Sequence, residues 1–243
     1  MKKFGIFFLV LLFSLLCGRF LSTAAANAGF ETEELPESRK DNIMKNIQLS
    51  FLDSEPSKHP IECFDVSESG LVAIGSEFFG NQTVCVYDSE GVFQYGYEFC
   101  DYGSFAVEWD GDCVLICFVR GDVAISVNAD GVVDRALEIQ RTVANNEHWR
   151  DLDSTKRVVG DRTYRMMNDS LGLPNLTTGA YSKIVVTQDG EKTVIYDATL
   201  QHFWKAAGIS LVSLVVVGGF AVMLIRYVKN GMGVQKPKAS VQQ

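Results

Sequence analysis

The sequence predicts an all-β protein, built as an antiparallel hairpin array, with a signal segment at its N-terminus and one transmembrane helix near its C-terminus. Short apolar runs alternate with acidic turns that end in glycine. The first four of these turn glycines recur at spacings of 21, 20 and 20 residues. The runs are rich in Val, Ile, Phe, Tyr and Cys and are too short for helices, which is typical of strands. An uncharged apolar run near each end predicts the two terminal segments.

Five glycines are predicted to close hairpin turns, because a tight reversal needs a positive φ that glycine adopts without strain. They are Gly70, Gly91, Gly111, Gly131 and Gly190. The first four lie in the continuous array 61–137, and the fifth follows 59 residues after the fourth, near three further periods. A representative unit is 84–93, Val-Cys-Val-Tyr-Asp-Ser-Glu-Gly-Val-Phe.

Hairpins repeated every 20 residues resemble the blades of β-propellers, in which two hairpins form a blade of about 40 residues. The resemblance covers residues 61–140 and, more loosely, 180–197. The sequence lacks the Gly-His and Trp-Asp signatures of WD-type blades. Its one Trp-Asp pair, Trp109-Asp110, lies directly before a turn glycine. About six hairpins correspond to three blades, fewer than the usual minimum of about four. We therefore expect an incomplete β-propeller-like array or a β-sandwich rather than a closed propeller.

Three segments of the array also resemble uncharacterised exported proteins of Firmicutes bacteria. They are 61–70, Ile-Glu-Cys-Phe-Asp-Val-Ser-Glu-Ser-Gly, 87–97, Tyr-Asp-Ser-Glu-Gly-Val-Phe-Gln-Tyr-Gly-Tyr, and 103–111, Gly-Ser-Phe-Ala-Val-Glu-Trp-Asp-Gly. Many members of that group carry a terminal membrane segment. The resemblance implies an exported, membrane-anchored protein and implies no activity.

Residues 1–28 have the order of a signal peptide: Lys2 and Lys3, an uncharged apolar run over 4–17, and an A-x-A site at 26–28. A 14-residue run spans only about 21 Å as a helix, against roughly 30 Å for a bilayer core. We expect cleavage after Ala28. The alternative is an uncleaved anchor that extends past Arg19 and adds a second membrane segment.

Residues 203–228 are predicted to form the transmembrane helix, since 206–225 contain 20 residues without a charge. Aromatic residues flank this run, and the basic residues that follow it predict a cytoplasmic tail over 229–243. The expected topology is type I, single pass, in the cell membrane. Between the terminal segments we expect a polar leader over 29–58, mobile or partly helical, and an extracytoplasmic β domain over 59–202.

The exported part is strongly acidic. All 30 Asp and Glu residues and 14 of the 22 Lys and Arg residues lie between 29 and 202, which gives this part a formal charge of −16. Such a surface repels nucleic acid and anionic lipid, so neither is an expected partner. Residues 59–119 contain 11 carboxylates and no Lys or Arg, whereas seven cations cluster in 135–165. Whether that cluster folds back over the acidic hairpins decides how much charge remains exposed.

The turn carboxylates suggest an interaction surface. Its candidate residues are Asp88, Glu90, Asp110, Asp112 and Asp130. We expect a binding or interaction module whose partner is an envelope protein or a cell-wall component.

The alternative is an envelope hydrolase that uses two carboxylates among Glu108, Asp110 and Asp112 as general acid and base. Solvent around a two-residue turn leaves carboxyl pKa values ordinary, which favours binding over catalysis.

No cofactor and no metal are expected. The sequence lacks a phosphate-binding loop, a His-Glu-x-x-His motif and a Cys-x-x-Cys pair. The segment 126–131 partly mimics a calcium loop, but Leu137 occupies the position of the essential acid. Cys63 and Cys85 lie on equivalent strands and could form a disulfide, although strand cysteines are more often small core residues.

Overall fold

The chain has 243 residues, and its structure, a computed structural model, describes residues 29–78, 80–100, 103–168 and 179–231. The predicted signal segment 1–28 and most of the predicted tail 229–243 lie outside the described residues. The described residues form 14 strands and three helices, and all strand pairs are antiparallel. The predicted antiparallel β protein with one apolar C-terminal helix is therefore confirmed.

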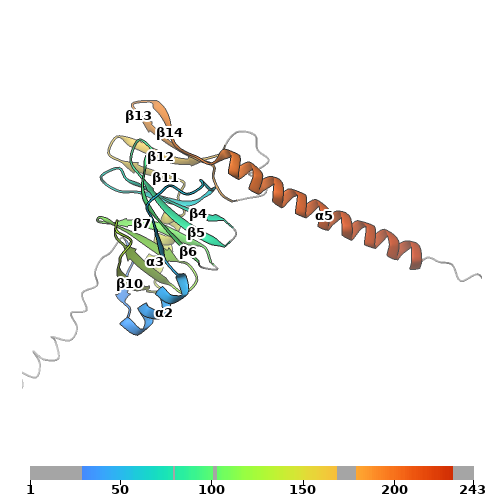
Figure 1. Ribbon diagram of the computed structural model, residues 1–243, viewed down its shortest axis with the longest axis horizontal. Helices are drawn as coiled ribbons and strands as arrows, with labels where there is room; N and C mark the ends of the chain where they lie inside the picture. Colours follow the sequence, from blue (N-terminus) through green and yellow to red (C-terminus); the bar gives the residue numbers. More distant parts are fainter. Residues whose placement is uncertain (1–28, 79, 101–102, 169–178, 232–243) are drawn as a thin grey trace, which may run out of the picture.

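Three sheets, each based on a four-stranded antiparallel meander, make up the domain (Figure 1). The first sheet contains β3 (Ile61–Val66), β4 (Val72–Phe78), β5 (Asn81–Tyr87) and β6 (Phe93–Cys100). The second contains β7 (Phe105–Asp110), β8 (Cys113–Phe118), β9 (Val123–Val127) and β10 (Val133–Ile139). The third contains β11 (Lys156–Val159), β12 (Arg162–Met167), β13 (Lys183–Gln188) and β14 (Glu191–Asp197).

The segment expected as a polar leader belongs to the domain. It forms β1 (Thr32–Glu34), helix α2 (Glu37–Ile47) and β2 (Ser50–Leu52). β1 adds to the edge of the second sheet beside β10, and β2 adds to the edge of the first sheet beside β6. The partial helix was expected. The two edge strands were not, because strands of three residues are too short to show a period in the sequence.

The first sheet lies in the middle of the stack. One face packs against the second sheet and α2, and the other packs against the third sheet. The outer face of the second sheet is covered by Phe30, Trp149 and Leu152, the last two from helix α3 (Val143–Leu152). Figure 1 shows the same order, with the third sheet at one side of the domain and β10 and α2 at the other.

This arrangement explains the sequence pattern of the strands. In β4 and β5 of the middle sheet, successive residues such as Val72, Ala73 and Ile74 are all buried, alternately toward the two neighbouring sheets. Strands covered on both faces therefore read as continuous apolar runs. In the third sheet only one face is covered, so Ile184 and Val186 alternate with more exposed residues.

Three hairpin turns share one design. In each, the side chain of Ser67, Asp88 or Asn128 accepts a hydrogen bond from the backbone N–H four residues later, at 2.9 Å. The five glycines predicted to close turns all have positive φ. Their φ angles are +88° at Gly70, +84° at Gly91, +62° at Gly111, +79° at Gly131 and +84° at Gly190.

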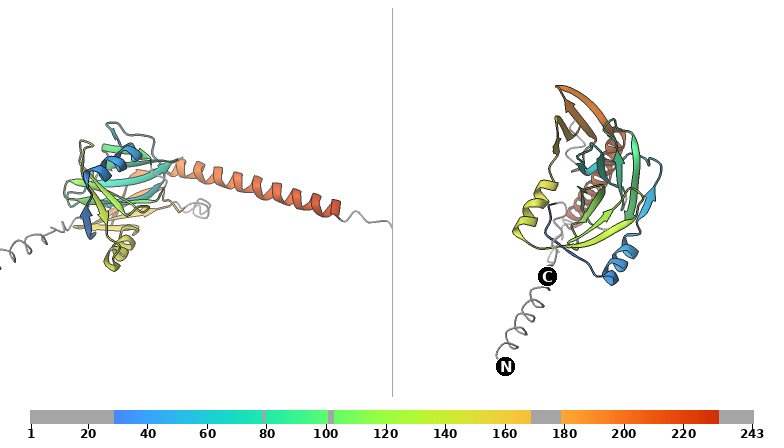
Figure 2. Two further views of the ribbon diagram at one scale, coloured as in Figure 1. Left: turned by 90° about the horizontal axis from the view of Figure 1, so that it is seen from below. Right: turned by 90° about the vertical axis from the view of Figure 1, so that its left-hand side faces the viewer.

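Helix α5 (Thr199–Gly231) begins two residues after β14 and extends away from the domain as one long rod (Figure 2). Among the described residues it is the one helix long and apolar enough to cross a membrane. Its first turns pack on the domain, because His202 and Ala206 are buried. Almost all side chains after Ala206 are exposed.

The glycine turns provide a test of the packing between sheets. A side chain at Gly91 would collide with the backbone carbonyl of Ile195 in β14, whereas a side chain at Gly111 would enter open space. Both positions have positive φ, so alanine at either costs about 1 to 2 kcal/mol of strain. We expect Gly91→Ala to lower the free energy of unfolding by at least about 1 kcal/mol more than Gly111→Ala, because backbone must also move. Thermal unfolding of the full chain measures both, and equal losses would show that this turn does not pack on β14.

Candidate functional site

Each of the three meanders has a first strand, and these strands, β3, β7 and β11, meet at Asp65 of β3. Its carboxylate accepts hydrogen bonds from the backbone N–H of Trp109 in β7, at 2.9 Å, and from Nε of Arg157 in β11, at 2.8 Å. The Arg157 guanidinium also donates to the carbonyl oxygen of Leu152, at the end of α3, at 3.0 Å. It lies over the ring of Phe64, with its central carbon 5.4 Å from the ring centroid. Asp65 and Arg157 therefore connect all three sheets to α3.

A polar pocket of about 320 Å³ opens beside this ion pair. Its charged and titratable lining residues are Asp65, Glu108, His148, Asp151, Lys156 and Arg157. Inside it, Nε2 of His148 and Oε2 of Glu108 are 3.0 Å apart, and the two side chains are only 19% and 14% exposed. Burial raises the pKa of the Glu108 carboxyl to about 7, and the hydrogen bond and charge of His148 oppose this rise only in part. Glu108 can therefore exchange a proton near neutral pH.

The N-terminal segment fixes the position of His148. Gly29 lies so close to the imidazole ring that a side chain there would collide with it, and the ring of Phe30 meets the imidazole edge to face at 4.4 Å. The amide of Asn145 joins this segment to α3, because its Oδ1 accepts from Glu31 N–H and its Nδ2 donates to Glu31 O, both at 2.8 Å. Sequence reasoning missed His148 because it lies 40 residues from Glu108 in a region expected to be a connection.

The candidate interaction residues have three different roles. Asp88 accepts two backbone hydrogen bonds inside its own turn, so its carboxylate is a structural cap. Asp110 forms an ion pair with Arg135. Glu90, Asp112 and Asp130 are exposed, and none of them forms an ion pair with a described residue.

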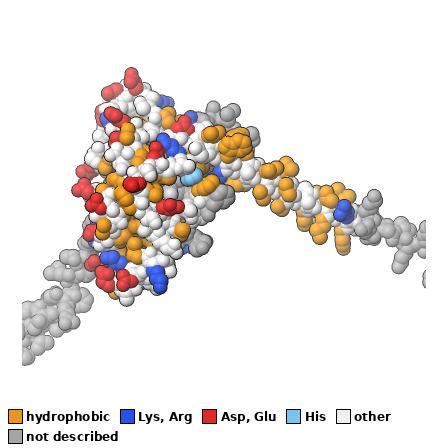
Figure 3. All heavy atoms as spheres, viewed as in Figure 1, with side chains coloured by type: hydrophobic (Ala, Val, Ile, Leu, Met, Phe, Trp, Pro, Cys, Tyr) orange, Lys and Arg blue, Asp and Glu red, His pale blue; other side chains and the backbone are white. Residues whose placement is uncertain are grey.

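These carboxylates lie at one end of the domain. Because the sheets are meanders, the turns β3–β4, β5–β6, β7–β8 and β9–β10 leave their sheets at the same end. Figure 3 shows acidic side chains along the edge of the domain that faces away from α5. We call this part of the molecule, with Glu90, Asp112 and Asp130 in its turns, the acidic end.

The basic cluster returns to the acidic hairpins only in part. Arg135 reaches Asp110, Arg157 reaches Asp65, and Arg141 reaches Asp122. Each of these contacts neutralises a carboxylate inside the fold or beside a strand end. The exposed turn carboxylates receive no such partner from the described residues, so the acidic end keeps a negative surface.

The structure does not gather the three carboxylates considered for hydrolysis. Glu108 lines the polar pocket and bonds to His148, Asp110 is held by Arg135, and Asp112 is exposed in the β7–β8 turn. Two other carboxylates, Asp65 and Asp151, line the pocket with Glu108, and Asp65 is already bonded on both oxygens.

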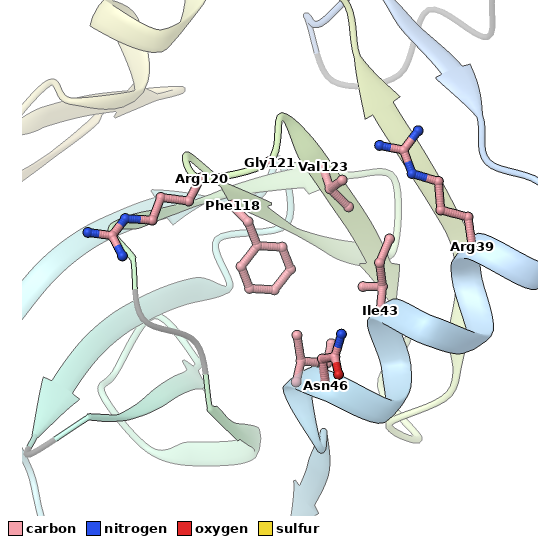
Figure 4. A pocket seen from close by; sticks show the side chains of 8 residues that line it. Arg39, Ile43, Asn46, Phe118, Arg120, Gly121 and Val123 are labelled. Atoms are coloured by element: carbon pink, nitrogen blue, oxygen red, sulfur yellow. The ribbon is translucent and has the colours of Figure 1, made fainter.

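A second pocket, of about 300 Å³, lies between α2 and the β8–β9 hairpin (Figure 4). Ile43 of α2 and Phe118 of β8 line its centre, and Arg39 and Arg120 stand at its edges. Arg39 donates to Glu138 at 2.7 Å, and Figure 4 shows the guanidinium groups of Arg39 and Arg120 on opposite sides of the apolar centre. The two cations therefore do not converge on one ligand position.

Metal ligation finds no support in the described residues, where no group of three or more His, Cys, Asp or Glu side chains is placed to hold an ion. In the segment that partly mimics a calcium loop, Asn128 instead accepts hydrogen bonds from the turn backbone. The five cysteines among the described residues are free thiols, and Cys63, Cys85 and Cys117 are buried as small core residues.

No protein-family model, curated protein or solved structure matches the chain.

The raised pKa of Glu108 predicts a pH-dependent stability. A carboxyl whose pKa is higher in the folded than in the unfolded state holds its proton more tightly after folding. Its contribution to the free energy of unfolding is therefore complete below about pH 4.5 and is lost as the pH rises to about 7. We expect wild-type protein to lose stability relative to Glu108→Gln across this range, by up to about 1.4 kcal/mol per pH unit.

Thermal unfolding of both full chains between pH 5 and pH 7.5 measures this difference. Glu147→Gln, at an exposed position of the same neighbourhood in α3, is the control and should follow the wild type. A constant difference between wild type and Glu108→Gln would contradict the raised pKa.

Proposed function

We propose that the protein is a single-pass membrane protein whose acidic end binds a cationic partner in the cell envelope, either a protein or a cell-wall component. The observation that carries the proposal is the opposite placement of the acidic end and α5. The exposed turn carboxylates face away from the helix that would hold the domain at a membrane (Figure 3).

The anchoring part rests on α5. Its residues 208–225 are exposed and, apart from two serines, apolar, which in water would leave a large unfavourable surface. Burial in a bilayer removes that surface from water, and the uncharged run of 20 residues over 206–225 matches a hydrocarbon core of about 30 Å. The basic residues after the run favour a cytoplasmic C-terminus and hence an extracytoplasmic domain.

The binding part rests on uncompensated charge. A surface carrying one sign of charge attracts opposite charge over about a Debye length, which is about 8 Å at physiological ionic strength. Glu90, Asp112 and Asp130 lie on three different turns, so a partner can contact several carboxylates at once. Such a surface raises the rate of association with a cationic partner and makes binding sensitive to salt.

We also infer that the three sheets form an incomplete propeller-like array. Each sheet contains a four-stranded meander like a propeller blade. The first strand of the middle meander is β3, and it lies against β7 and β11, the first strands of the other two meanders. In a sandwich two sheets enclose one core, whereas here the middle sheet takes part in two cores.

The topology can be tested with the chain's own Cys100, which is exposed on the domain. A membrane-impermeant maleimide added to intact cells, or to cells without their wall, should label Cys100. Replacing Cys100 and the partly exposed Cys113 by Ser should remove the label from the domain. A cysteine substituted for Gln243 in this double-Ser chain should react only after the membrane is opened. The reverse pattern would contradict the orientation.

Binding can be tested by charge reversal at the acidic end. The triple change Glu90→Lys, Asp112→Lys and Asp130→Lys spares Asp88 and Asp110, which have structural partners. We expect the full chain in detergent or nanodiscs to capture an envelope component, with capture falling steeply between low and high salt. The triple variant should lose that capture, because its turns repel a cation.

The matched control reverses three exposed carboxylates elsewhere, Glu33, Asp41 and Glu147, for the same change in net charge. It should keep most of the capture. Equal losses in the two triple variants would assign the effect to net charge, and capture that ignores salt would contradict an electrostatic partner.

A further inference from the structure

The first turns of α5 are part of the domain. The backbone N–H of Ala198, directly before the helix, donates to Ser182 O at 2.8 Å. Nζ of Lys205 then lies 3.2 Å from Glu62 Oε1 in β3 and 3.5 Å from Glu77 O in β4. The exposed apolar run begins directly after these contacts, so the domain meets the helix where a bilayer would begin.

The β4–β5 hairpin lies beside this junction. The residue after Glu77 is Phe78, whose ring stacks on His59 with centroids 4.3 Å apart and an interplanar angle of 10°. Despite this stacking, 41% of Phe78 is exposed. Figures 1 and 2 show β4 and β5 ending on the side of the domain from which α5 leaves.

Two further aromatic side chains are exposed at the same level. Phe203 and Trp204, in the second turn of α5, are 51% and 66% exposed, and their ring centroids are 5.7 Å apart. Aromatic rings concentrate at the headgroup level of bilayers, and lysine can extend its ammonium group toward the headgroups from that depth. Four side chains therefore lie at the start of the apolar run. We call this group the collar, and its residues are Phe78, Phe203, Trp204 and Lys205.

We propose that the end of β4 is a second membrane contact, with Phe78 inserted at the phospholipid headgroup level beside α5. This inference rests on the proposed anchoring by α5. The occupant is lipid because the collar is continuous with the helical surface that the bilayer would cover. A helix alone leaves a domain free to tilt, whereas a helix and a hairpin fix its orientation, and the acidic end is then held away from the membrane.

The test uses the full chain in phosphatidylcholine nanodiscs that contain a phosphatidylcholine with a photoactivatable diazirine near its glycerol. Mass spectrometry locates the labelled residues. We expect label on the first turns of α5 and on the β4–β5 hairpin around Phe78. Phe51 of β2 is a matched control, because it is similarly exposed, at 45%, but packs beside the Gly131 turn. It should stay at background.

Variants separate the possible outcomes. Phe78→Ser should lower hairpin labelling severalfold and leave the label on α5 unchanged, which also reports that the chain is inserted and folded. Phe51→Ser should change neither. Label on α5 with the hairpin at the level of Phe51 would overturn the second contact and leave the anchoring intact. Absence of label from α5 would overturn the anchoring proposal and this inference with it.

Discussion

The ion pair between Asp65 and Arg157, whose side chains are only 14% and 15% exposed, is the contact on which the packing of the three sheets depends. Asp65 belongs to the middle sheet, Arg157 to the third sheet, and the N–H of Trp109 that also bonds Asp65 belongs to the second sheet. A buried charge is stable only with partners, and removing one partner of such a pair typically costs about 3 to 5 kcal/mol. The pair also reaches the end of α3 through Leu152, and α3 carries His148 to Glu108.

The position of the acidic end follows from the way the sheets are joined. In an antiparallel meander the first and third turns lie at one end, so the acidic turns of the first two sheets emerge together. The last strand, β14, runs away from its own hairpin turn, and α5 therefore starts at the opposite end. The separation of the acidic end from α5 therefore follows from strand order, once the contacts of Asp65 have placed the three sheets side by side.

The sequence predicted those features that depend on local spacing. The recurring glycines located the turns, because Gly91 and Gly131 need positive φ, and the uncharged run located α5. It allowed a partial helix before Pro60 but did not show the two edge strands there, since strands of three residues have no measurable period. The pattern of apolar runs also left open which sheets face each other.

In the candidate site, too, the sequence predicted the local features and not the contacts between distant residues. Turn chemistry predicted that Glu90, Asp112 and Asp130 would be exposed, because short acidic turns lie at a domain surface. It could not predict that Asp110 is paired with Arg135 or that Glu108 meets His148, since these contacts join residues 25 and 40 positions apart across different elements. The pocket that Glu108 and His148 line exists only after the three sheets have packed, because Asp65 and Arg157 line it as well.

The central claim is that the acidic end retains a negative field in the folded protein. A fluorophore attached to a cysteine at position 129, in place of Ala129 in the β9–β10 turn of a chain with Cys100→Ser and Cys113→Ser, measures that field through collisional quenching. At low ionic strength, cationic caesium should quench this label faster than anionic iodide, relative to their rates on the free dye, and the difference should vanish in high salt. Equal relative rates at low ionic strength would show that the carboxylates are neutralised, and would contradict the account.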